Sequence, residues 1–199
     1  GLQNERFIVH GRYERNTLAV ENGLADILLA DPEPKAVIMV GAYAPCAVFV
    51  KLAREHGLQA LLLNVSFVGG EPFAEELGRE GDGVIVTQVV PHYRSDLPIA
   101  RAFNRALAAW NPLVGPSFGA FEGYIATRLF LRALGSIHGE LTREAVIDAL
   151  EGMGQFDLGL GTPLALSAEE HQASHQVWPT IIRNGKLVPF QWKDLKKSR

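Results

Sequence analysis

The sequence predicts an α/β fold built around a parallel sheet. Three short apolar runs, at residues 36–40, 60–63 and 83–86, begin 24 and 23 residues apart. Each pair of runs is separated by a loop and a helical pattern, and such alternation is typical of a parallel sheet covered by helices. A sheet of this kind binds ligands outside the carboxyl ends of its strands. The loops that follow the first two runs are therefore the first place to look for function.

Further elements are expected around these runs. Residues 7–13 predict a strand, and residues 17–30 carry apolar side chains at helical spacing and predict a helix. The prolines of the DPEP segment at 31–34 end that helix. The first run then leads into the loop 41–45 and a helix, and the second leads into the loop 64–70 and a short helix.

Beyond Pro91 the pattern changes to consecutive helices. Asp96 is placed to cap a helix over residues 97–110, and the longest helix is expected over residues 118–134. Thr142 is placed to cap a helix that ends near residue 150. No strand is expected between these helices. Because helices in an α/β protein must cover a sheet, they need strands that this stretch does not supply.

The last quarter predicts a hairpin. Residues 155–163 are rich in glycine and read as irregular. The β-prone runs 177–183 and 186–190 flank Asn184-Gly185, and Asn-Gly between two such runs is a strong hairpin signal. Residues 194–199 are expected to form a polar tail.

Composition indicates an ordinary globular protein. The 199 residues are 47% hydrophobic and 21% charged, with a net charge of −3, which is typical of a globular domain and gives no electrostatic reason to expect nucleic acid. No apolar stretch approaches the roughly 20 residues of a membrane span. The single cysteine permits no internal disulfide.

The sequence nominates no catalytic residue, metal site or cofactor. Cys46 lies in the first turn of a predicted helix, where a thiol can be activated, but no base is visible nearby and a small buried group is the expected role. His171 and His175 have the i,i+4 spacing of metal ligands, yet their surroundings read as a polar turn. Gly159 and Gly161 lack the third glycine and the preceding strand of a dinucleotide site.

Two loops carry the candidate ligand contacts. Tyr43 and Ala44 follow the first apolar run just before a helix whose free amides face the same crevice. A tyrosine in that position can stack on a ligand and donate a hydrogen bond. Ser66 and Phe67 occupy the equivalent loop of the second unit.

A resemblance to one family runs through nearly the whole chain. Its segments, in order, are residues 12–17, 37–58, 63–70, 83–91, 119–134 and 169–190. Together they resemble type I periplasmic binding proteins, and more narrowly the leucine/isoleucine/valine-binding group that serves ABC importers. The resemblance covers only the C-terminal part of such proteins.

The resemblance implies two lobes. Residues 1–91 and 164–193 would form the second ligand-binding lobe, a Rossmann-like parallel sheet. Residues 92–163 would be the helical portion of the first lobe, whose sheet belongs to the family's N-terminal half. The chain would cross between lobes near residues 89–92 and return near residues 163–175.

The resemblance also implies a ligand site between the lobes. Tyr43 matches an aromatic residue that contacts ligand in family members. The acidic residue that receives an amino acid's ammonium falls at Ser66 or Phe67, and neither is acidic. A buried ammonium without a carboxylate is costly. An aromatic or aliphatic carboxylate, or an amide, therefore suits these residues better than a free amino acid.

The expected function is that of a non-enzymatic, extracytoplasmic solute-binding protein, periplasmic or tethered to the membrane, that delivers a small molecule to an ABC permease. The apolar helix over 118–134, without its sheet, would favour self-association. Two alternatives stay open. One is a sensor or regulator of the same fold, and the other is a flavodoxin-like enzyme that uses Cys46 or His171.

Overall fold

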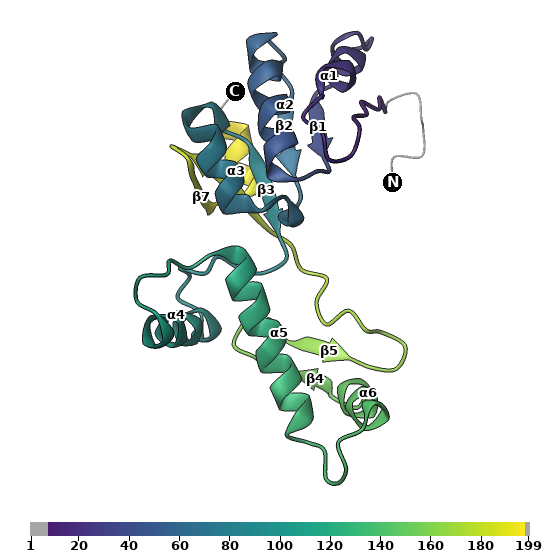
Figure 1. The fold of residues 1–199 in the computed structure, drawn as a ribbon, viewed down its shortest axis with the longest axis vertical. Coiled ribbons are helices and arrows are strands. Elements are labelled where there is room, and N and C mark those ends of the chain that lie inside the picture. The colour runs from purple at the N-terminus through teal and green to yellow at the C-terminus, as the bar shows by residue number, and fades with distance from the viewer. Residues whose placement is uncertain (1–7, 198–199) are drawn as a thin grey trace. The chain divides into compact units, whose positions relative to one another are not determined.

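The computed structural model describes residues 8–197, which divide into two compact units. The sheet unit comprises the chain up to Gln88 and again from Pro179 onward, and the helical unit comprises Val89–Trp178. Figure 1 shows both, with the sheet unit carrying β1 to β3 and β7 and the helical unit carrying α4 to α6. Each unit is described by itself.

The sheet unit contains a five-stranded sheet in the order β1-β2-β3-β6-β7. The first three strands are parallel, and Met39 lies opposite Asn64 at the carboxyl ends of β1 and β2. The predicted parallel α/β fold is confirmed. The strands are β1 (Ala36–Met39), β2 (Leu61–Asn64), β3 (Ile85–Gln88), β6 (Trp178–Arg183) and β7 (Lys186–Pro189).

The predicted hairpin is the antiparallel pair β6–β7. Its two turn residues, Asn184 and Gly185, have φ values of 49° and 70°. Positive φ at both central residues is the requirement of a type I′ turn, which Asn-Gly meets with little strain. The dipeptide therefore fixed both the place and the register of this hairpin.

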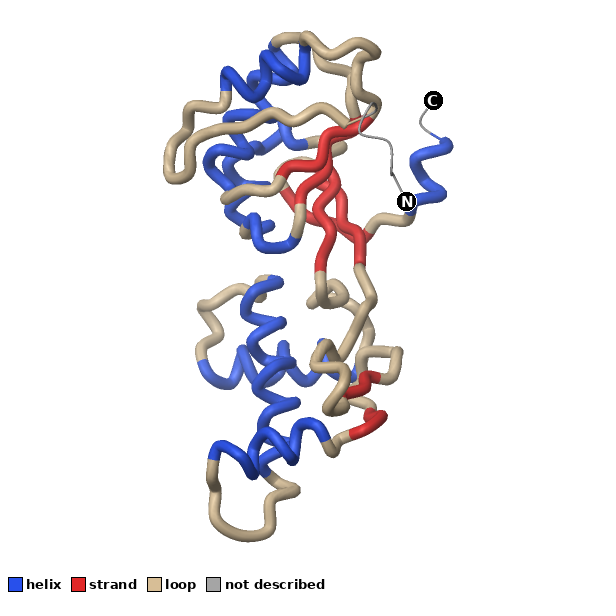
Figure 2. Tube along the Cα trace, turned by 90° about the vertical axis from the view of Figure 1, so that its right-hand side faces the viewer, coloured by secondary structure: helices blue, strands red, loops and turns tan. Residues whose placement is uncertain are grey.

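Helices gather on one side of the strands of the sheet unit (Figure 2). They are α1 (Glu21–Leu28), α2 (Tyr43–Glu55) and α3 (Gly70–Leu77). The 3₁₀ helix η4 (Trp192–Lys197) brings Leu195 against a buried cluster of Ile85, Ile181 and Phe190. The segment expected to be a polar tail therefore contributes to the core of the sheet unit, because Leu195 packs against the sheet.

Two predictions near the N-terminus need correction. Residues 8–13 form no strand, and Phe7 lies outside the described residues. A strand exists only where its backbone groups find a partner, and no described residue forms a backbone hydrogen bond with residues 8–13. The helix predicted over residues 17–30 is shorter and begins at Glu21.

The helical unit holds the three predicted helices α4 (Pro98–Trp110), α5 (Phe118–Leu134) and α6 (Arg143–Glu151). Aromatic packing joins α4 to α5, with the ring centroids of Phe103 and Phe121 5.0 Å apart. Farther along α5, Phe130 and Leu131 are exposed, as expected for a helix that lacks part of its cover. No helix in the described part of the chain is long and apolar enough to traverse a bilayer.

The helix caps were predicted with mixed success. The Thr142 side chain accepts a hydrogen bond from the amide of Ala145 at 3.1 Å, which confirms the predicted cap of α6. The cap predicted at Asp96 is wrong, because its carboxylate instead binds the guanidinium of Arg101 at 2.6 Å. Leu97 occupies the N-cap position of α4, where no side chain accepts a hydrogen bond.

The helical unit also has strands that the sequence did not predict. β4 (Gly154–Phe156) and β5 (Leu164–Leu166) form a short antiparallel pair. β4 overlaps the start of the stretch expected to be irregular, residues 155–163, and β5 follows directly after that stretch. This pairing holds residues 164–166 in the helical unit, whereas the return to the other lobe was predicted to begin at residue 164. Contacts place that return at Pro179. The sequence pattern of β4 and β5 is weak because each strand has only three residues.

The segment that enters the helical unit is anchored by aromatic rings. His92, Tyr93 and Phe118 have ring centroids 4.6–5.3 Å apart. Tyr93 and Phe118 are buried, and Phe118 is the first residue of α5. The chain after β3 is thus held against the N-terminus of the longest helix.

Candidate functional site

The candidate site lies at the carboxyl edge of the parallel strands. β1 ends at Met39 and β2 ends at Asn64, and these two residues are partners in the sheet register. The loops that leave them therefore start side by side. Both predicted contact pairs, Tyr43 with Ala44 and Ser66 with Phe67, lie within five residues of a strand end.

Tyr43 and Ala44 open helix α2. Tyr43 is the first residue of the helix and its side chain is 44% exposed, while Ala44 is half-buried. The N-cap residue, Ala42, supplies no side-chain acceptor for the first amides of the helix. Those amides are left for solvent or a ligand, and they favour a negatively charged or carbonyl oxygen.

Ser66 and Phe67 lie on the 3₁₀ helix η2 (Ser66–Val68). Phe67 is 64% exposed, whereas its neighbour Val68 is buried. Gly69 then takes a φ of 78°, a conformation that glycine adopts without penalty. The short helix thus turns one apolar side chain into the fold and presents the aromatic ring outward.

A buried polar layer, which the sequence pattern did not predict, lies behind these loops. Asn64, Gln88 and Thr180 are each 1% exposed. The Thr180 hydroxyl donates to the carbonyl of Val86 at 2.8 Å and accepts from Gln88 Nε2 at 3.4 Å. Two of these residues could have been predicted from the sequence, because Asn64 and Gln88 each end an apolar run, LLLN and IVTQ, with a single amide side chain.

Asn64 is the least satisfied member of this layer. Its Oδ1 accepts a hydrogen bond from the amide of Val65 at 2.8 Å. Its Nδ2 finds no oxygen or nitrogen acceptor among the described residues, and the Asn64 side chain has only the weak sulfur acceptor of Cys46 beside it. An unpaired buried donor costs about 1–3 kcal/mol. Such a donor at a binding edge is suited to a water molecule or a ligand oxygen.

Tyr13 joins the site from the N-terminal segment. A Cβ atom added at Gly41 would collide with the Tyr13 hydroxyl and lie 3.0 Å from the Cys46 sulfur. Glycine is therefore required here for close approach. Burial raises the pKa of the Tyr13 phenol, and the nearby Cys46 adds to this effect. Nothing in the spacing of the sequence indicated this contact, because the two residues lie on different elements.

Cys46 has the environment of a structural residue. It is 4% exposed, and burial raises the pKa of its thiol, an effect that the Asn64 side chain partly opposes. A nucleophile needs the reverse, a lowered pKa and access to solvent. These properties count against an enzyme that uses Cys46.

His171 and His175 are not arranged as metal ligands. They lie outside any helix, so the i,i+4 spacing does not bring their rings to one face. His171 instead contacts Glu151 at 2.9 Å and His175 contacts Glu170 at 3.3 Å, all near the surface. The part of the chain that the structure describes contains no cluster of three metal-ligating side chains.

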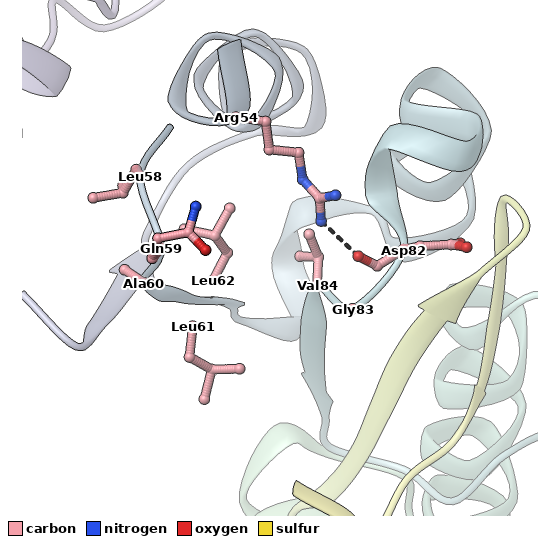
Figure 3. A pocket seen from close by; sticks show the side chains of 9 residues that line it. All are labelled: Arg54, Leu58, Gln59, Ala60, Leu61, Leu62, Asp82, Gly83 and Val84. Atoms are coloured by element: carbon pink, nitrogen blue, oxygen red, sulfur yellow. Dashed lines mark hydrogen bonds between the residues drawn. The ribbon is translucent and has the colours of Figure 1, made fainter. Parts of the chain in front are cut away.

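A small cavity of about 270 Å³ lies at the other edge of the sheet. Figure 3 shows Arg54 bonded to the carbonyl of Asp82 beside Leu61 and Val84, at the amino ends of β2 and β3. Ligands of open parallel sheets bind at the opposite edge. We therefore do not assign the binding function to this cavity.

Comparisons with known proteins agree with this architecture. The sequence profile of the periplasmic binding protein family matches residues 16–186. A solved structure from Rhodopirellula baltica, described as a possible leucine/isoleucine/valine-binding protein, is 46% identical with a TM-score of 0.91. The match covers 94% of this chain and 51% of that one. No curated protein matches the chain at a significant level.

More distant structures share the fold. A substrate-binding periplasmic protein from Ralstonia solanacearum is 29% identical with a TM-score of 0.77, and covers 90% of this chain and 51% of its own. A fatty acid ABC transporter substrate-binding protein from Thermomonospora curvata is 19% identical with a TM-score of 0.74, covering 90% and 47%. The chain thus spans about half the length of these relatives. By its sequence profile and its fold, it belongs to the type I periplasmic binding proteins.

Proposed function

We propose that this chain is the C-terminal part of the substrate-binding component of an ABC importer of the branched-chain amino acid type. In this proposal Tyr43, Ala44, Ser66 and Phe67 form one wall of the ligand site. The remaining wall comes from the half of the family fold that residues 1–199 do not cover. The protein acts outside the cytoplasm, in the periplasm or tethered to the membrane, without catalysing a reaction.

The observation that carries the proposal is the pairing of exposed aromatic rings with free donors at one sheet edge. Tyr43 and Phe67 offer apolar surface. The first amides of α2 and the Asn64 amide offer hydrogen bonds. Apolar pockets with a few convergent polar groups are the usual form of small-molecule sites. The donors fit a carboxylate or amide oxygen on a ligand with an apolar body.

The same two loops lack a carboxylate that could pair with an ammonium group. Neither loop, at residues 41–45 or 64–70, contains an aspartate or glutamate. Enclosing a ligand's ammonium without a carboxylate would cost several kcal/mol. We therefore favour an aromatic or aliphatic carboxylate, or an amide, over leucine itself, although the relative at 46% identity is described as a possible leucine/isoleucine/valine-binding protein.

The ligand class is tested by calorimetry on the full gene product that carries these residues. Leucine is compared with 4-methylpentanoate, which is leucine without its ammonium, with the amide of that acid, and with phenylacetate. We expect a ligand without the ammonium to bind at least about tenfold more tightly than leucine, a difference of about 1.4 kcal/mol. Tighter binding of leucine would refute the ligand class.

The site is tested separately by substitution. Tyr43→Ala and Phe67→Ala each remove an aromatic contact worth about 0.5–1.5 kcal/mol and are expected to weaken binding several-fold, up to about tenfold. Trp110→Ala is the matched control, because Trp110 is an exposed aromatic residue on α4. Equal affinities of the Tyr43, Phe67 and Trp110 variants would refute the site while leaving the ligand class untouched.

The transport role has its own test. Closure of two lobes on a ligand is a hinge motion, and an importer presents the closed form to a permease. Permease and ATPase genes beside this one, and ligand-dependent binding of the protein to that permease, are expected. Fusion to a kinase or a DNA-binding domain would instead identify a sensor of the same fold.

A further inference from the structure

The end of α4 and the loop that joins it to α5 expose three large apolar side chains of the helical unit (Figure 1). Trp110, the last residue of α4, is 75% exposed, and Leu113 and Val114 in the loop are 93% and 42% exposed. Single exposed apolar residues are ordinary, whereas a group of them marks a surface that contacts another molecule. We call Trp110, Leu113 and Val114 the apolar tip.

A tight turn presents the apolar tip. The amide of Val114 donates to the carbonyl of Asn111 at 3.2 Å, and the amide of Leu113 donates to the Asn111 side-chain oxygen at 3.0 Å. These bonds close a turn over residues 111–114, in which Leu113 occupies a corner. The most exposed side chain of the apolar tip therefore projects from a turn whose backbone is hydrogen-bonded within itself.

The apolar tip lies apart from the surface of α5 that lacks cover. Phe130 and Leu131, the exposed residues of that surface, lie at least twelve residues beyond Phe118, the first residue of α5. This separation is about 18 Å along the helix. Phe118 itself is buried, so the end of α5 that follows the loop is already packed. The uncovered surface of α5 does not account for the exposure of the apolar tip.

The charges near the apolar tip are positive. Residues 97–121 contain two arginines and no acidic residue, whereas residues 122–178 contain eight acidic residues and three arginines. Arg101 is paired with Asp96 at 2.6 Å. Arg105 is exposed and forms no ion pair with a described residue. It lies five residues before Trp110, about 7.5 Å along α4. A free cation thus stands directly behind the apolar side chains.

This combination fits the surface of a bilayer that contains anionic lipid. Tryptophan favours the membrane–water interface, and a neighbouring leucine can enter the boundary with the acyl chains. An arginine set a few ångströms behind them can reach the phosphates of the headgroups. Because Leu113 projects from the corner of a turn, the apolar tip suits a deformable apolar phase. The basic residues make an anionic surface the favoured one.

We infer that the end of α4 and the following loop dock the protein onto anionic lipid, with Trp110 and Leu113 at the interface and Arg105 at the headgroups. All three residues belong to the helical unit, whereas the proposed ligand contacts Tyr43 and Phe67 belong to the sheet unit. The inference therefore does not depend on the proposed ligand. It adds a direct lipid contact to the extracytoplasmic role proposed above.

The test measures co-sedimentation of the full gene product with vesicles of phosphatidylcholine, alone or with about 30% phosphatidylglycerol. We expect binding to the anionic vesicles and its loss at high salt, because salt screens the attraction of Arg105. A fluorescent label attached to Pro112→Cys is expected to shift its emission to the blue when the loop inserts. Cys46, the other cysteine of residues 1–199, is 4% exposed and does not compete for the label.

Leu113→Ser is expected to weaken vesicle binding at least about tenfold, since it removes one inserted apolar side chain. Arg105→Gln is expected to weaken it about fivefold, the effect of one basic residue near an anionic surface. Leu141→Ser is the matched control, because Leu141 is 64% exposed in the same unit and follows the acidic Glu140. Unchanged thermal melting of each variant shows that it is folded.

The inference is overturned if the anionic vesicles are not bound, if vesicles without phosphatidylglycerol bind equally well, or if the Leu113 and Leu141 variants bind alike. A protein occupant is a separate outcome. If the full gene product binds its permease, Leu113→Ser abolishes that binding and no vesicle is bound, the apolar tip is a protein interface and the inference is wrong.

Discussion

The buried hydroxyl of Thr180 is expected to stabilise the polar layer behind the candidate site. Thr180 lies on β6, and its hydroxyl connects the Val86 carbonyl and the Gln88 amide of β3. Thr180→Val keeps the volume of the side chain while removing both hydrogen bonds. Thr180→Ser keeps the hydroxyl and removes one methyl group. The pair of variants therefore separates hydrogen bonding from packing.

The expected magnitudes follow from burial. Val86 and Gln88 are 0% and 1% exposed, so water cannot replace the lost hydroxyl. A buried group left without its partner costs about 1–3 kcal/mol, and we expect Thr180→Val to lower the unfolding free energy of the sheet unit by about 2 kcal/mol. Thr180→Ser loses about 0.8 kcal/mol, the value of one buried methylene-sized group.

Hydrogen exchange measured by mass spectrometry is the assay, because it reports on the sheet unit separately from the helical unit. Peptides that contain β3 and β6 are expected to lose protection about 30-fold in Thr180→Val, since 1.4 kcal/mol is a factor of ten. The loss in Thr180→Ser is about fourfold on the same scale. The reasoning is refuted if the valine variant is as protected as the serine variant, because removing both hydrogen bonds would then cost no more than removing one methyl group.

Three further predictions concern the site and the surface. Gly41→Ala is expected to lower the unfolding free energy by about 1–3 kcal/mol through overpacking. Adding Tyr13→Phe to that variant removes the colliding hydroxyl and should recover part of the loss in urea denaturation. If the effects of the two substitutions on the unfolding free energy simply add, the contact is contradicted. Because burial raises the pKa of the Cys46 thiol, the folded state holds this proton more tightly than the unfolded state. The thiol's contribution to stability is therefore complete below its unfolded-state pKa and declines as the pH rises above that value. Between pH 8 and 11 a Cys46→Ala variant should lose less stability than the unsubstituted chain. Equal losses in the two proteins would contradict a raised pKa of the Cys46 thiol. Phe130→Glu is expected to reduce any self-association of the chain in light scattering, because Phe130 is exposed on α5, and unchanged association would exclude that surface.

The sequence by itself determined the elements whose signals are local. Asn184-Gly185 specified a type I′ turn, and Thr142 specified the start of α6, because turn and cap preferences depend on a few neighbouring residues. The alternation of apolar runs with helices indicated a parallel sheet, and with it the edge where Tyr43 and Phe67 lie. These inferences need no knowledge of distant contacts.

The tertiary structure alone decided which groups meet. Residues 8–13 read as a strand, but a strand needs a partner and none of the described residues supplies one. Asn64 and Gln88 are polar residues that ended apolar runs, and only the folded sheet shows that both are buried, one with an unpaired donor. The approach of Tyr13 to Gly41 joins elements distant in sequence. Burial and pairing are properties of the assembled chain, so local patterns could indicate the carboxyl edge of the strands but could not reveal the polar layer beneath it.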